Sequence, residues 1–69
     1  MMKMFVWRNV LTDYTNGIAI AMARTEKEAR KVILRDAPDF AQEELTRDIA
    51  GPPDHIYDKP HGVHCWGGG

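Results

Sequence analysis

The N-terminal part of the chain contains two runs of apolar side chains separated by a polar segment. Lys3–Leu11 is rich in Phe, Val, Trp and Met, which suit a pleated and half-buried surface, so this run predicts a strand. Ile18–Ala23 predicts its partner, because large side chains alternate there with alanines. One face of this second strand would carry Ile and Met side chains. The other would carry only methyl groups and could admit a helix at close range.

The pair Asn16-Gly17 between the two runs is a strong signal of a β-hairpin, because both residues tolerate the positive φ of a type I′ turn. A two-residue turn centred on this pair would place Leu11 opposite Met22. A longer loop with a bulge would move that register by one residue, and the sequence leaves the choice open.

The middle of the chain follows the period of helices. Thr25-Glu26-Lys27-Glu28 is a capping box, which predicts a helix that begins there and ends near Arg35 or Asp36. Pro38 is suited to a first helical turn and predicts a second helix that extends to about Ile49. The apolar stripes that would pack these helices on the sheet consist of Ala29, Val32 and Ile33 in the first helix and Ala41, Leu45 and Ile49 in the second.

The C-terminal part predicts one more short strand at the edge of the sheet, formed from Ile56-Tyr57, Val63 and Trp66. The expected fold is therefore α+β: an N-terminal β-hairpin, two helices and a short C-terminal strand. We expect a single domain over residues 1–66, followed by a flexible, disordered glycine tail over residues 67–69, which has no side chains to pack.

Length and composition narrow the setting in which the chain acts. A chain of 69 residues has room for one domain, and it buries only about 60% of the surface that its unfolded form exposes. With Cys65 as the single cysteine there is no internal disulfide, so we expect a reducing compartment and self-association as an aid to stability. Arg8 interrupts the N-terminal apolar run, which favours neither a signal peptide nor a membrane span. The expected location is the cytoplasm.

Charge is unevenly distributed along the chain, although the net charge is only −1. Residues 1–35 carry seven basic and three acidic side chains, whereas residues 36–69 carry two basic and seven acidic ones. The basic half contains four cations spaced by three and four, which would form one ridge on a helix: Arg24, Lys27, Lys31 and Arg35.

The basic ridge allows two interpretations. It is either an anion site, for a nucleotide, a nucleic acid or an acidic protein surface, or a solvated helix face. In the second case its cations would meet the acidic second helix through Glu43, Glu44 or Asp48.

Three histidines and the cysteine near the C-terminus form the only group with metal-ligand chemistry, namely His55, His61, His64 and Cys65. In an extended segment His64 and Cys65 would point to opposite faces, so we expect no metal and no other cofactor. Cys65 with His61 or His64 is also the only candidate pair for a nucleophile and its base. We therefore do not expect an enzyme. Trp66 is better interpreted as an aromatic side chain available to a partner.

Two resemblances add expectations about function. Gly68-Gly69 after a hairpin and a helix resembles the end of ubiquitin-like sulfur carriers, whose terminal glycine carboxylate is adenylated. A closer likeness, over most of the chain, is to small orphan proteins of tailed bacteriophages and prophages. It depends on Phe5-Val6-Trp7, the run from Leu11 to Ala19, Ala23 with the Glu-rich helix start, and Lys59-Pro60-His61-Gly62 leading to Trp66-Gly67-Gly68-Gly69. Members of this group with a known role often bind and disable a host component.

The sequence as a whole therefore predicts a small non-enzymatic binding protein, a phage accessory protein that inhibits a host defence component. Its partner would be a host protein or a small anionic ligand such as a nucleotide, and neither nucleic acid nor a membrane is expected. We expect a homo-oligomer. The alternatives are a zinc module and a ubiquitin-like carrier. The residues expected to bind are Arg24, Lys27, Lys31, Arg35 and Trp66.

Overall fold

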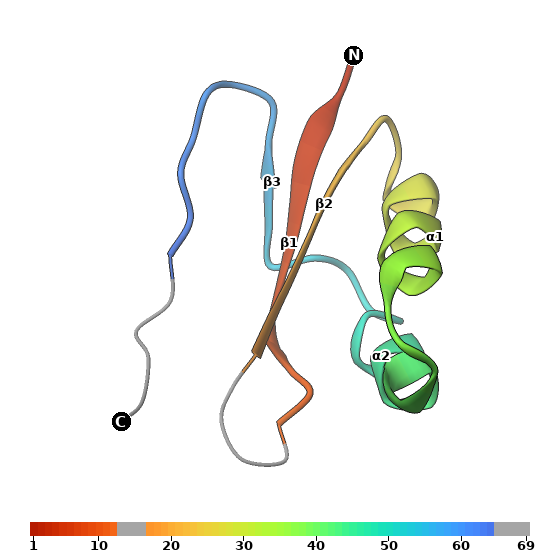
Figure 1. The fold of residues 1–69 in the computed structure, drawn as a ribbon. Coiled ribbons are helices and arrows are strands. Elements are labelled where there is room, and N and C mark those ends of the chain that lie inside the picture. Colours follow the sequence, from red (N-terminus) through yellow and green to blue (C-terminus); the bar gives the residue numbers. More distant parts are fainter. Residues whose placement is uncertain (13–16, 65–69) are drawn as a thin grey trace.

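A three-stranded antiparallel sheet forms one layer of the structure, and two helices cover one of its faces (Figure 1). The computed structural model describes residues 1–12 and 17–64. The elements are β1 (Lys3–Val10), β2 (Gly17–Ala23), α1 (Glu26–Asp36), a short 3-10 helix η1 (Asp39–Ala41), α2 (Gln42–Asp48) and β3 (His55–Tyr57). The predicted α+β class, with a hairpin, two helices and a short last strand, is confirmed.

β1 is the central strand, because the order in the sheet is β2-β1-β3. Asp54 attaches β3 to it: its N–H donates to the Val6 carbonyl at 2.8 Å, and its carboxylate accepts from the Arg8 N–H at 2.6 Å. The prediction of an edge strand at Ile56-Tyr57 is therefore confirmed. It was wrong for Val63, which lies outside any strand.

The register of the hairpin differs from the predicted one. Gly17 pairs with Val10, and Met22 lies opposite Met4 rather than Leu11. β1 leaves the ladder earlier than a two-residue turn requires, with a bulge between Arg8 and Val10 and a left-handed backbone at Asn9 (φ 57°). Asn16 and the rest of the turn lie outside the described residues.

A long-range contact explains where β1 ends. Leu11 also has a left-handed backbone, with φ of 50°, and its N–H donates to the Asp48 carboxylate at 2.9 Å. The chain is thus held against the end of α2 before it returns as β2. Gly17 is needed for a different reason from the expected positive φ: a Cβ there would lie 2.7 Å from the Val10 carbonyl oxygen.

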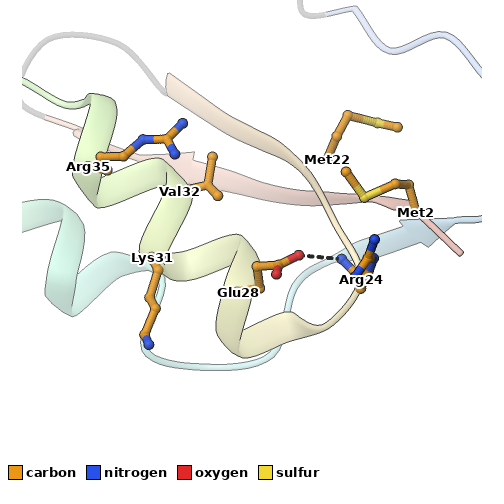
Figure 2. Close-up of a pocket in the computed structure, with 7 residues that line it drawn as sticks. All are labelled: Met2, Met22, Arg24, Glu28, Lys31, Val32 and Arg35. Atoms are coloured by element: carbon orange, nitrogen blue, oxygen red, sulfur yellow. Dashed lines mark hydrogen bonds between the residues drawn. The ribbon is translucent and has the colours of Figure 1, made fainter.

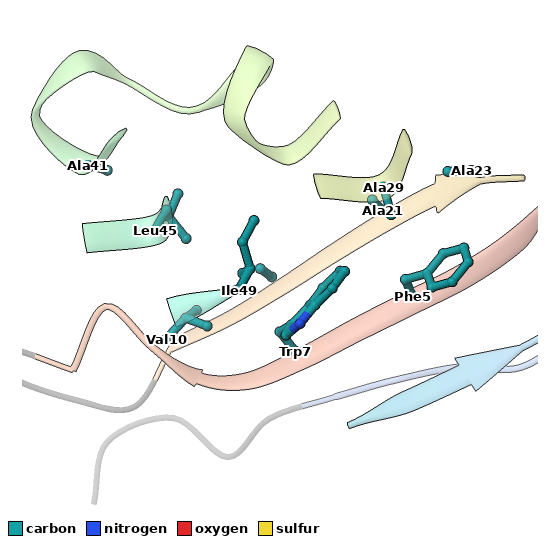
Figure 3. Close-up of a cluster of buried hydrophobic side chains, with 10 residues drawn as sticks. Phe5, Trp7, Val10, Ala21, Ala23, Ala29, Ala41, Leu45 and Ile49 are labelled. Atoms are coloured by element: carbon teal, nitrogen blue, oxygen red, sulfur yellow. The ribbon is translucent and has the colours of Figure 1, made fainter. Parts of the chain in front are cut away.

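The core lies between the sheet and the helices (Figure 3). The methyl face of β2 is buried against α1, as the alternation predicted, and Ala29 of α1 is fully buried there. Small side chains on both sides let the helix approach the strand closely. The larger core residues come from β1, from α2 and from the residue that caps its C-terminus, and they are Phe5, Trp7, Val10, Leu45 and Ile49.

Both helices begin near the predicted positions. Thr25 caps α1, since its Oγ1 accepts from the Glu28 N–H at 3.1 Å, and the Glu28 carboxylate reaches back to the Arg24 N–H at 2.8 Å. The second predicted helix is divided into η1 and α2. Gln42, the first residue of α2, donates from its side-chain amide to the Ala37 carbonyl at 2.9 Å and so satisfies the end of α1.

Arg30 connects α1 to β1 and to the end of α2. Its Nε donates to the Ile49 carbonyl at 2.7 Å and its Nη2 to the Gly51 carbonyl at 2.9 Å. The same Gly51 carbonyl accepts from Trp7 Nε1 at 3.0 Å, and the Arg30 guanidinium lies 5.5 Å from the centre of the Trp7 ring. Three elements far apart in the sequence are thereby joined by one side chain.

Neither α1 nor α2 approaches the length and apolar character of a membrane-crossing helix, and the described residues contain no other helix that does.

Candidate functional site

The basic ridge predicted from the sequence is divided in the structure. α1 begins at Glu26, so Arg24 precedes the helix and lies on the link from β2. Arg24, Lys31 and Arg35 line one hollow, whereas Lys27 lies outside it. The prediction of a helical ridge was therefore wrong for Arg24, which is not helical, whereas Lys27, Lys31 and Arg35 lie on α1 four residues apart as predicted.

The hollow lies between the end of β2 and the outer side of α1 (Figure 2). Its volume is about 630 Å³, and it is open to solvent. Met22 of β2 and Met2, which precedes β1, lie on the sheet side, and Val32 of α1 lies across from them. The apolar part of the hollow is thus bordered by three cations, Arg24, Lys31 and Arg35, and by the carboxylate of Glu28.

The charges around the hollow are only partly compensated. Arg35 forms a two-bonded pair with Asp36, at 3.0 and 3.1 Å. The hydrogen bond from Arg35 lowers the pKa of the Asp36 carboxyl below its ordinary value, and the same bond raises the pKa of Arg35. Within the described part of the chain, Arg24 and Lys31 form no ion pair.

In the part of the chain that the structure describes, no ion pair joins the ridge to α2. In the described segments, ion pairs join Arg35 to Asp36 and Arg30 to Glu26, both local to α1. Asp48 uses its carboxylate for the Leu11 N–H instead. Of the three cations at the hollow, Arg35 is thus paired with Asp36, whereas Arg24 and Lys31 form no ion pair within the described residues.

A second hollow continues the first along β2. Its volume is about 270 Å³, and it is lined mainly by apolar residues, among them Ile18 and Ile20 of β2 and Ile33 of α1. Val32 lines both hollows, so they lie next to each other between β2 and α1, and we treat them together as one groove. We call it the β2 groove. Its end near Arg24 is cationic, and its end near Ile18 is apolar.

Large apolar side chains are exposed at this groove and elsewhere. Ile20 is 43% exposed and Met22 55%, on the face of β2 that turns away from the helices. The alternation of large side chains with alanines in β2 was a sequence signal that could have identified both Ile20 and Met22 as exposed. Phe40 is 90% exposed and was missed, although it falls outside the stripe of Ala41 and Leu45. Trp66, the aromatic residue chosen from the sequence, lies outside the described residues.

Two of the three histidines, His55 and His61, stack on the ring of Tyr57. The ring of His61 lies 3.7 Å from that of Tyr57, and the ring of His55 lies 5.7 Å from it. Among residues 1–12 and 17–64 no group of three metal-ligating side chains gathers at one point. Cys65 is outside the described part, so its proposed partnership with His61 or His64 is untested.

Comparison of the chain with protein-family models, with curated proteins and with solved structures finds no match. Evidence about function therefore comes from the residues and their arrangement.

Proposed function

We propose that this chain is a small non-enzymatic binding protein that captures an acidic partner in the β2 groove. The observation that carries the proposal is the combination of two cations without ion pairs, Arg24 and Lys31, with exposed apolar side chains such as Met22. Apolar contact area supplies the free energy of binding, while complementary charge steers and orients the partner.

Binding without catalysis fits the chemistry of the groove. Its described lining contains Met, Val, Ile, Leu, Ala, Arg and Lys side chains with two carboxylates, and neither hollow is lined by Ser, Cys or His. A nucleophile with an adjacent base is therefore not part of this lining. The groove is also wide open, which suits a macromolecular surface better than the enclosed sites that bury small substrates.

The resemblance to small phage proteins supports a role against the host. In this proposal the partner is a bacterial protein in the cytoplasm, and occupation of the β2 groove inhibits it. A nucleotide is the second candidate, because the larger hollow, at about 630 Å³, has a volume typical of small-ligand sites. Both candidates are anionic, and both depend on the same cations.

Affinity capture from a bacterial lysate tests the proposal with two matched variants. Arg24→Gln/Lys31→Gln removes the two groove cations. Lys27→Gln/Arg47→Gln removes the same charge from exposed positions outside the groove. We expect the first variant to lose the bound species, identified by mass spectrometry, and the second to keep it. Capture should weaken steeply with added salt. Equal capture by both variants would overturn the proposal.

A further inference from the structure

β2 has a free edge. Its neighbour in the sheet is β1, and its other side is bordered by the β2 groove. Edge strands present a row of backbone N–H and C=O groups on which another strand can pair. The first question is which residues of β2 direct these groups outward.

The contacts of β1 answer it. The Val6 carbonyl and the Arg8 N–H both bond to Asp54, on the β3 side. Backbone groups of successive residues point to opposite edges of a strand, so even-numbered residues of β1 face β3. Val6 lies opposite Ile20. Because the backbone groups of Val6 point toward β3, this is a non-hydrogen-bonded pair, in which the N–H and C=O groups of the two residues point away from each other. Ile20 therefore directs its N–H and C=O to the free edge.

The same reasoning applies to the neighbours of Ile20. Arg8 pairs with Ile18 and Met4 with Met22, so Ile18 and Met22 also face outward. No hydrogen bond from elsewhere in the described residues reaches these three. A row of three donors and three acceptors thus lies along the groove, with α1 as the opposite wall.

We propose that the β2 groove binds an extended segment of its partner, which joins the sheet as a further strand on β2. The inference rests on the proposed function and specifies how the acidic partner is held. Backbone hydrogen bonds to Ile18, Ile20 and Met22 supply affinity, and alternate side chains contact the two walls.

The two ends of the groove define the chemistry of the segment. The end near Arg24 and Lys31 is cationic, whereas the end near Ile18 and Ile33 is apolar. An antiparallel segment runs from the Arg24 end toward the Ile18 end. Its N-terminal half therefore carries Asp or Glu, and its C-terminal half carries Val, Ile or Thr.

A second copy of this chain is a poor occupant of the groove. The β2 strand, Gly17–Ala23, contains no acidic residue. An antiparallel pair of β2 strands would set the Ile18 end of one copy against Arg24 and Lys31 of the other, so these cations would meet no complementary charge. Charge complementarity thus selects an acidic segment of a different protein.

A peptide library tests the inference on the wild-type protein. Its members have seven residues, the length of β2, with acidic residues in the N-terminal half and Val, Ile or Thr in the C-terminal half. A second library has the two halves exchanged. We expect binders from the first library and weaker or no binding from the second. The absence of binders from the first library at millimolar concentration overturns the inference.

N-methylation of the best peptide then tests strand pairing directly. Methylating alternate residues removes the N–H donors along one edge of the peptide, and methylating the other set removes those along the opposite edge. One isomer should bind like the parent peptide. The other should bind at least about tenfold more weakly, because it loses its backbone bonds to β2. Equal affinities of the two isomers, measured by fluorescence anisotropy, overturn strand addition.

A pair of protein variants supplies the complementary measurement. Ile20→Pro removes the outward N–H at the centre of the edge, and prolines are tolerated on edge strands. Ile20→Thr removes the same side chain but keeps the N–H. We expect Ile20→Pro to lose peptide binding and Ile20→Thr to retain most of it, with circular dichroism confirming the fold. If Ile20→Pro unfolds, the affinities of the two methylated peptides for the wild-type protein still test strand addition.

The two proposals can fail separately. Loss of lysate capture in Arg24→Gln/Lys31→Gln, with equal affinity of the methylated isomers, leaves the proposed function standing and removes strand addition. If Arg24→Gln/Lys31→Gln captures the same species from the lysate as the wild type does, the proposed function is refuted. A nucleotide that displaces the peptide from the cations while the isomers bind equally assigns the groove to a small anion and overturns the inference.

Discussion

Replacing Arg30 tests the account of how the two layers are held together. Arg30→Met keeps a long apolar side chain over Trp7 but removes two hydrogen bonds, to the carbonyls of Ile49 and Gly51. A hydrogen bond to a charged group contributes about 1.5–3 kcal/mol, and an exposed cation–π contact about 0.5–1 kcal/mol. The Arg30 side chain is 26% exposed, and water can replace its bond to Gly51. We therefore count only the bond to Ile49, at about 1.5–2 kcal/mol, and the cation–π contact, at about 0.5–1 kcal/mol.

The expected loss is about 2–3 kcal/mol of unfolding free energy. A domain of 69 residues is stable by only about 3–10 kcal/mol, so the change is a large fraction of the total. Urea unfolding followed by far-UV circular dichroism measures it. Glu26→Gln serves as the control, because it removes only the exposed ion pair with Arg30, at 3.3 Å, and should cost a few tenths of a kcal/mol. If Arg30→Met costs no more than Glu26→Gln, the bridging role is refuted.

Three further predictions address other parts of the chain. Gly17→Ala should destabilise by about 1–2 kcal/mol in urea unfolding, because the new Cβ would lie 2.7 Å from the Val10 carbonyl oxygen; unchanged stability would contradict this contact. NMR titration should give Asp36 a pKa below the ordinary aspartate value, and Arg35→Gln should return the pKa to that value. Because the pKa of Asp36 is lower in the folded state, its contribution to stability is present above the unfolded-state pKa. That contribution is lost as the pH falls through the folded-state pKa. Light scattering should show self-association, as expected for so small a core, and a monomer at tens of micromolar would contradict that expectation.

Local patterns predicted the parts of the fold that depend on neighbours in the sequence. The alternation from Ile18 to Ala23 correctly assigned the alanines to the helix side, because a strand reverses the side of each successive residue. The Thr25 cap was predicted for the same reason, since its bond to the Glu28 N–H spans three residues. Such features need no knowledge of the rest of the chain.

Features that depend on distant contacts were not predictable in the same way. The end of β1 is fixed by the bond of Leu11 to Asp48, thirty-seven residues further along. Nothing in the sequence distinguished Arg30 from the other cations, because both of its backbone acceptors, Ile49 and Gly51, lie about twenty residues further along, just after α2. The candidate site shows the same limit: Arg24 and Lys31 were identified as cations, but their position beside Met22 required the packing of α1 on β2.

The alanines of β2 link the stability of the fold to the proposed binding. They let α1 pack closely over β2, which leaves the larger side chains, Ile20 and Met22, on the other face and partly exposed. An added strand would cover part of that surface and turn β2 from an edge strand into an interior one. A partner that binds only the folded chain stabilises it by RT ln(1 + [L]/Kd), which is about 2.7 kcal/mol at a hundred times Kd. For so small a domain this is comparable to the contribution of Arg30, and at about 4–8 °C per kcal/mol, occupation of the β2 groove should raise the melting temperature by roughly 10–20 °C.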